Sequence, residues 1–193
     1  MAPPDSVLGI DGNRHVFDRL RALIGSRTAI SFVGAGASAG LYPLWPELVH
    51  LLIGEAVKRG LATEADRATW ERLRTTQPQQ VARGVRERLG RDVYSAVLRE
   101  LFGLRSDPAH TEVQGLLMRL PFRGHVTTNY DLGLLEARRL LRPDVPATSS
   151  ATWQDDDALR AWNTGEVFGD HACPVLYAHG VFGRSDTVLL RRS

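Results

Sequence analysis

The sequence predicts an α/β protein with a parallel, doubly wound sheet. A run of β-branched and aromatic residues leads into a glycine-rich or polar loop and then into an amphipathic helix, and this order occurs twice. The first occurrence is "TAISFVGAGASAGLYPLWPELV" and the second is "GHVTTNYDLGLLEARRLL". Strands that alternate with helices are typical of parallel sheets. The 193 residues, 43% of them hydrophobic, are enough for a core of this kind.

The first predicted elements lie between residues 13 and 60. Residues 1–12 form a loose lead-in, and Val16, Leu20, Leu23 and Ile24 then recur at helical spacing behind a possible cap at Asn13, up to Gly25. "TAISFV" has the length and the two apolar faces of a central parallel strand. "WPELVHLLIGEAVKRG" is a helix with proline at its start and glycine at its end.

The middle of the chain is helical. Residues 61–105 are charged, show helical periodicity and contain no convincing strand, so we expect two or three helices there, inserted as a lobe. Trp70 and Tyr94 are expected to fill the core of that lobe rather than to stack on a ligand.

The rest of the chain returns to strands. "GHVTTNYD" is a strand followed by the helix "LGLLEARRLL", and "CPVLYAHG" is a third strand. Residues 142–172 are difficult to assign, apart from a short helix at "DDDALRAW" capped by one of its aspartates. "DTVLLRRS" is a fourth apolar run.

Composition excludes several classes of protein. The 24 Lys and Arg residues nearly balance the 22 Asp and Glu residues, and a net charge of +2 is too small to indicate direct nucleic-acid binding. The start of the chain has no signal-peptide pattern, and its apolar stretches fall short of the roughly 18 residues that span a bilayer. We therefore expect a cytoplasmic protein without membrane association.

No metal site is expected. Cys173 is the only cysteine, which excludes a disulfide framework and any zinc site built from several cysteines. Five histidines have no metal-ligand spacing with cysteine or with one another: His15, His50, His110, His125 and His171.

Three strand ends carry the residues of chemical interest. In an open parallel sheet ligands bind beyond the carboxyl ends of the strands, so "GAGAS", "TTNYD" and "HG" should meet in one crevice. Gly34 and Gly36 suit either a tight turn or the close approach of a phosphate, and the Ser38 hydroxyl can bind an anionic oxygen. The loop lacks a P-loop lysine, and Gly40 lies one place too late for the strict dinucleotide fingerprint.

Asn129 and His179 are the candidate catalytic residues. The Asn129 amide can donate and accept hydrogen bonds at a strand end, although it can equally cap the next helix, and for Asp131 the cap is the better explanation. His179 can titrate near neutral pH, although a lone histidine in such a place is often structural.

Taken in order, "FVGAGASAG", "VTTNYD" and "VLYAHG" resemble the sirtuin-like NAD-consuming domains of bacterial anti-phage defence proteins. The resemblance covers residues 28 to about 190. It implies a Rossmann-like sheet with a helical insertion, NAD as substrate, and Asn129 and His179 as the catalytic pair. The residues that it implies for NAD binding are Gly34, Ala35, Gly36, Ser38, Thr128 and Asp131.

The differences from that family refine the expectation. Sirtuin deacylases carry a four-cysteine zinc module, which a chain with Cys173 alone cannot form, and a tryptophan in "LYPLWPELV" replaces their Asp-Phe-Arg. The relatives also carry a later Gly-x-Ser and Asp motif, so we expect residues 1–193 to be one NAD-binding domain at the N-terminal end of a longer protein.

The function expected from this resemblance is NAD⁺ hydrolysis to nicotinamide and ADP-ribose in anti-phage defence. The alternatives are a non-catalytic NAD- or ADP-ribose-binding module and ADP-ribosyl transfer. The expected partners are further copies of the chain, or a sensor domain or partner protein.

Overall fold

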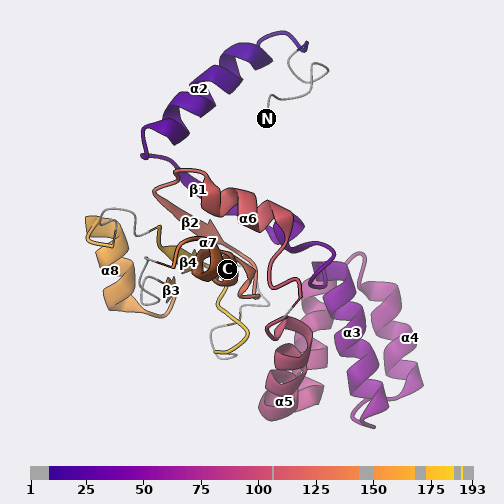
Figure 1. Cartoon of the computed structure of the whole chain (residues 1–193). Coiled ribbons are helices and arrows are strands. Elements are labelled where there is room, and N and C mark those ends of the chain that lie inside the picture. Colours follow the sequence, from indigo (N-terminus) through magenta and orange to yellow (C-terminus); the bar gives the residue numbers. More distant parts are fainter. Residues whose placement is uncertain (1–8, 106, 144–149, 168–172, 185–187, 189–193) are drawn as a thin grey trace.

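The computed structural model describes residues 9–105, 107–143, 150–167, 173–184 and 188. In these residues the fold is mixed α/β, with an all-parallel sheet of four strands in the order β1-β2-β4-β3 (Figure 1). The strands are β1 (Ile30–Val33), β2 (Gly124–Thr127), β3 (Ser150–Thr152) and β4 (Val175–Tyr177). The helices are α2 (Asn13–Gly25), the 3-10 helix η1 (Ala35–Ser38), α3 (Trp45–Lys58), α4 (Glu64–Leu73), α5 (Pro78–Phe102), α6 (Glu112–Arg119), α7 (Gly133–Leu141) and α8 (Asp156–Thr164).

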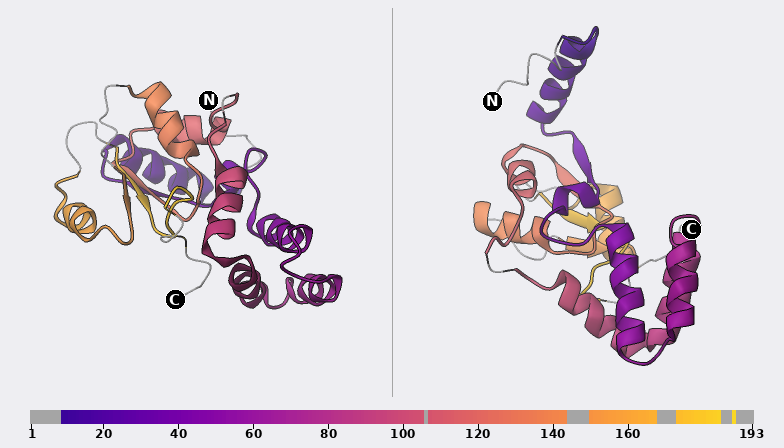
Figure 2. Two further views of the ribbon diagram at one scale, coloured as in Figure 1. Left: turned by 90° about the horizontal axis from the view of Figure 1, so that it is seen from below. Right: turned by 90° about the vertical axis from the view of Figure 1, so that its right-hand side faces the viewer.

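One face of the sheet is covered by α6 and α7, which lie against each other (Figures 1 and 2). Val33 of β1 and Val175 of β4 pack there with Met118 of α6 and with Leu134 and Ala137 of α7. The exposed fraction of each of these side chains is 4% or less. This cluster fixes where the strands end relative to the two helices.

The opposite face of β1 is open, and the prediction of a central strand is wrong for the described residues. In their sheet β1 pairs with β2 alone and so lies at an edge. Phe32 is 72% exposed and Ile30 45% exposed, while Val33 on the other face is buried. The apolar content of "TAISFV" predicted a strand correctly, but not which neighbours would cover it.

The helical group of α3, α4 and α5 lies beside the sheet (Figures 1 and 2). Its core includes Leu48 and Leu52 of α3 together with Tyr94 of α5, and Trp70 of α4 packs against it. Both aromatic side chains therefore contribute to the core, as the sequence predicts. Helix α5 is broken at Gly90, whose φ of 71° lies in the left-handed region that glycine tolerates.

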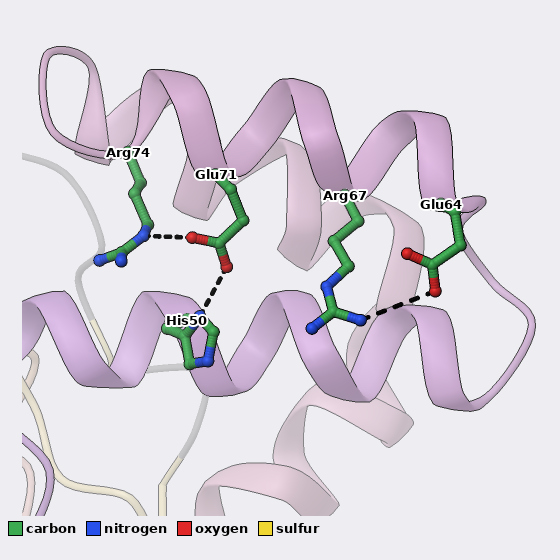
Figure 3. Close-up of polar contacts among 5 residues, drawn as sticks. All are labelled: His50, Glu64, Arg67, Glu71 and Arg74. Atoms are coloured by element: carbon green, nitrogen blue, oxygen red, sulfur yellow. Dashed lines mark hydrogen bonds and ion pairs between the residues drawn. The ribbon is translucent and has the colours of Figure 1, made fainter.

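Polar contacts join α3 to α4 on the outside of this group (Figure 3). His50 Nδ1 of α3 lies 2.6 Å from Glu71 Oε1 of α4, and the other carboxylate oxygen accepts a hydrogen bond from Arg74 Nε. Glu64 pairs with Arg67 within α4 at 3.6 Å. Glu71 thus ties the two helices together, and Glu64 does not.

Helix α2 projects away from the sheet (Figures 1 and 2). It ends at Gly25, as the sequence predicts, and none of its residues is buried. Asn13 is its first helical residue and not its cap. The cap position is occupied by Gly12, which has a φ of 80° and no side chain to accept a hydrogen bond.

Three elements were missed by sequence reasoning: β3, α6 and the short 3-10 helix η1. Asp155 stands at the N-cap position of α8, as predicted for one of the aspartates, but its carboxylate accepts hydrogen bonds from Thr152 and Arg184 instead of from the helix.

The apolar run 186–193 lies almost entirely outside the described residues. Within the described part of the chain, no helix combines the length and the apolar character needed to cross a bilayer.

Candidate functional site

The three strand ends meet in one cleft of about 490 Å³. Val33, Thr127 and Tyr177 are the last residues of β1, β2 and β4, and the parallel register brings them side by side. The segments that follow these strands form one side of the cleft. Its lining from these segments consists of Ala35, Ser38, Thr128, Asn129, Tyr130, Asp131 and His179.

The loop after β1 is not a tight turn that needs glycine. Gly34 has an extended conformation with a φ of −99°, and a Cβ added at Gly34 or Gly36 would meet nothing within 4 Å. The explanation by turn geometry is therefore wrong for these two glycines. Only Gly40, with a φ of 83°, needs the left-handed region. Gly34 and Gly36 are exposed and do not line the cleft, whereas Ala35 and Ser38 of the same loop do.

Ser38 and Asn129 are joined directly. Asn129 Nδ2 donates to Ser38 Oγ at 2.8 Å and to the carbonyl oxygen of Gly34 at 3.2 Å. The Gly34 carbonyl can only accept, so the amide nitrogen of Asn129 must face it. Asn129 Oδ1 is buried and has no hydrogen-bond partner among the described residues. Asn129 lines the cleft, and its Oδ1 is an acceptor that the described residues leave unsatisfied.

Asp131 is held at the start of α7. Its Oδ1 accepts from the Gly133 backbone N–H at 2.9 Å, but Leu132 occupies the N-cap position, so Asp131 stands one residue before the cap predicted for it. Burial raises the pKa of the Asp131 carboxyl, while hydrogen bonds from Ser38, Gly133 and Gln114 act in the opposite direction. Asp131 therefore both orders the helix start and takes part in the polar network beneath the cleft.

His179 follows β4 and lines the same cleft as Asn129. Its side chain is half-buried, and this burial lowers its pKa below the usual value of 6.5. The imidazole is therefore neutral at pH 7 and able to accept a proton. Gly180 beside it has a φ of 83°, which directs the chain away from the strand immediately after His179.

The opposite wall of the cleft comes from the helical group. Trp45 and Leu48 belong to the start of α3, Gln79 belongs to the start of α5 and Phe102 to its end, and Pro43 and Pro78 complete the wall. The Phe102 ring packs edge-on against Tyr130 at 5.7 Å, which joins the two walls. Among the described lining residues none is Lys or Arg. One wall is thus polar and the other mainly apolar.

Gln114 is the residue of this region that sequence reasoning missed. It lies on α6, is 0% exposed and contacts both Ser38 and Asp131. The spacing of Thr111 and Gln114 is that of a capping box, and both of its reciprocal hydrogen bonds are present. That pattern could have located the helix start, but not its contact with the cleft.

The other histidines of the described residues do not line the cleft. His125 is fully buried between Ser31 and Cys173, with its Nδ1 2.5 Å from Ser31 Oγ and its Nε2 3.1 Å from Cys173 Sγ. His50 pairs with Glu71, and His171 lies outside the described residues. Within the described part of the chain, no three His, Cys, Asp or Glu side chains are grouped as metal ligands.

Comparison with known proteins gives no further assignment, since no protein-family model and no curated protein matches the chain.

Proposed function

We propose that this protein is an NAD⁺ hydrolase that cleaves the bond between nicotinamide and ribose to give nicotinamide and ADP-ribose. The observation that carries the proposal is the convergence of Ser38, Asn129 and His179 on one cleft. The resemblance of the three strand-end segments to sirtuin-like domains supplies the choice of NAD. The same resemblance is the support for a Rossmann-like, doubly wound fold and for a role in anti-phage defence.

The cleaved bond joins the anomeric carbon to a nitrogen that is already cationic. Nicotinamide therefore leaves as a neutral molecule with the bonding electron pair and needs no proton donor. The site then has to orient the ribose, stabilise its developing positive charge and direct a water molecule to the anomeric carbon. The pair of carboxylates that ordinary glycosidases use is not required.

Asn129 and His179 suit these tasks. The unpartnered Oδ1 of Asn129 is an acceptor for a ribose hydroxyl or for the attacking water. Water forms the new C–O bond and loses one proton, and the neutral His179 imidazole is the base proposed to accept it. In this proposal the loop from Gly34 to Ser38 lies at the phosphates, and the wall with Trp45 and Phe102 encloses the nicotinamide side.

The test is nicotinamide release from NAD⁺ by the full chain, measured by chromatography. His179→Ala should lower the rate by about 10²–10⁴-fold while calorimetry still detects NAD⁺ binding. Asn129→Ala should also lose turnover. His50→Ala, on the outside of the helical group, is the matched control and should retain the wild-type rate.

Three outcomes separate the candidate functions. Nicotinamide and free ADP-ribose as products support hydrolysis, and ADP-ribose attached to a macromolecule, detected by mass spectrometry, identifies transfer. Binding of NAD⁺ by the wild-type chain without any nicotinamide release identifies a non-catalytic module. Unchanged release in both Asn129→Ala and His179→Ala refutes the assignment of the catalytic pair.

A further inference from the structure

A buried glutamine lies directly beneath the cleft floor. Gln114 does not line the cleft, yet its Nε2 donates to Ser38 Oγ at 2.9 Å and lies 3.3 Å from Asp131 Oδ1. Its side chain is 0% exposed, so no water competes for these bonds. Gln114 therefore connects α6 to two of the segments that form the polar wall.

The orientation of the Gln114 amide is fixed by the backbone. The Thr111 N–H lies 2.9 Å from Gln114 Oε1, and a backbone N–H can only donate. The oxygen of the amide must face Thr111, and the nitrogen must face Ser38. Thr111 is itself tied to the loop after β1, because its hydroxyl donates to the Ala37 carbonyl at 2.6 Å.

The fixed Gln114 amide and the Gly34 carbonyl together determine the directions of the other bonds in the network. Ser38 Oγ accepts one hydrogen bond from Gln114 Nε2 and one from Asn129 Nδ2, which uses both of its acceptor positions. Its own hydrogen is left to donate to the Asp131 carboxylate, with which it is hydrogen-bonded. Asn129 is then held with Nδ2 toward Ser38 and Oδ1 unpartnered.

We propose that Gln114 is a positioning residue of this cleft: by donating to Ser38 and Asp131, it acts together with the Gly34 carbonyl to hold Asn129 Nδ2 toward Ser38 and to keep Asn129 Oδ1 as the unpartnered acceptor of the amide. The functional part of this inference rests on the proposed NAD⁺ hydrolysis. The orientation of Asn129 is a property of the free protein and is testable without substrate.

The competing explanation is that Gln114 only caps α6. A second capping box offers a matched control, since Thr63 and Asp66 make the same pair of bonds at the start of α4 and line no part of the cleft. If capping is the whole role, Gln114→Met and Asp66→Ala should have similar effects. If Gln114 positions Asn129, only Gln114→Met should change the cleft.

The first readout needs no NAD. The side-chain ¹⁵N amide resonances of Asn129 should shift or broaden in Gln114→Met and stay unchanged in Asp66→Ala. Unchanged Asn129 resonances in folded Gln114→Met would overturn the inference. Because this measurement does not depend on turnover, it decides the inference even if the wild-type chain releases no nicotinamide and the proposed function fails.

The second readout is turnover. Gln114→Met should lower kcat by about 100-fold, the scale expected for a misplaced catalytic group, with a smaller change in KM. Asp66→Ala should retain the wild-type kcat. Equal kcat values in Gln114→Met and wild type would count against the inference, provided that wild type is active.

Gln114→Glu adds a pH profile that a purely structural role would not produce. The ionised carboxylate still accepts from Thr111 N–H but cannot donate to Ser38, whereas the protonated acid donates again. The titratable groups facing this position are Asp131 across the network and His110, whose ring lies against the neighbouring Gly115. Burial and Asp131 both favour the protonated form of the introduced acid.

The ratio of kcat in Gln114→Glu to kcat in wild type should therefore rise as the pH falls, and the Asn129 resonances of the variant should return toward their wild-type positions. Protonation of His179 at low pH lowers kcat in both proteins, and the ratio cancels this common loss. A ratio and resonances that do not change with pH would overturn the inference. This variant also decides the matter if Gln114→Met does not fold, because it keeps the bond to Thr111.

Discussion

Asn129 Nδ2 lies 2.8 Å from Ser38 Oγ, a hydrogen bond between residues 91 positions apart in the chain. It joins the segment after β2 to the loop after β1 and leaves Asn129 Oδ1 as the unpartnered acceptor at the cleft. The two strand-end segments thus form one polar wall whose parts depend on each other.

Ser38→Ala should destabilise the protein by about 1–3 kcal/mol, because Asn129 and Gln114 each lose a buried acceptor. Urea unfolding measures this free energy. Thr69→Ala on α4 removes an exposed hydroxyl that donates to the Ala65 carbonyl, and should change stability by less than about 0.5 kcal/mol. Equal stability of the two variants would show that the network contributes nothing.

Gly133→Ala should destabilise the protein and weaken NAD⁺ binding. A Cβ at Gly133 would collide with the Gln114 side-chain amide and displace it. Gly54→Ala is the control in α3, where a Cβ meets nothing within 4 Å and the better helix propensity of alanine should stabilise by up to about 1 kcal/mol. Thermal unfolding compares the stability of the two variants, and calorimetry compares their NAD⁺ binding. If both substitutions stabilised the protein, the predicted collision at Gly133 would be wrong.

Glu71→Ala should lower the stability of the helical group by up to about 1 kcal/mol, because Glu71 joins His50 of α3 to Arg74 of α4. Glu64→Ala removes a 73% exposed carboxylate that pairs only within α4, and should have a smaller effect. Urea unfolding of both variants checks the difference.

The Glu71 contribution should also depend on pH. Burial raises its pKa, but the hydrogen bonds from His50 and Arg74 outweigh burial and lower the pKa below 4.5. Its contribution is therefore present above pH 4.5 and is lost as the pH falls through the lowered pKa. An effect of Glu71→Ala that is as large at pH 3 as at pH 7 would contradict this assignment.

The protein should lose stability between about pH 6.5 and pH 4 because of His125. Burial, with added repulsion from Arg138 and Arg142, lowers the pKa of His125 to about 4. Over this range the unfolded chain binds a proton at His125 that the folded chain does not, which costs about 3 kcal/mol by pH 4. Urea unfolding at several pH values measures the loss.

His125→Gln is the control for this loss, since it removes the titrating group. Asp131, whose pKa is raised, and His179, whose pKa is lowered, titrate in both proteins, so the difference between wild type and variant isolates His125. A difference that stays constant from pH 6.5 to pH 4 would contradict the prediction.

Local patterns predicted most of the elements. The apolar periodicity of residues 45–60 and the glycine at position 25 located α3 and the end of α2, because these signals act within a few residues. The short β3 was missed, since Ser150–Thr152 has no apolar run to mark it. Asn13 was mistaken for a cap because its side chain suits that position, whereas Gly12 occupies it.

The sequence by itself determined that three strands would be followed by the segments that carry Ser38, Asn129 and His179. Parallel pairing of the strands was enough to bring these segments to one edge of the sheet. Only the tertiary structure decided that Gln114, 76 positions from Ser38, lies beneath them. It also decided that Phe32 is exposed and that the helical group supplies the second wall. Such contacts depend on how whole helices pack, and the periodicity of a single segment does not contain that information.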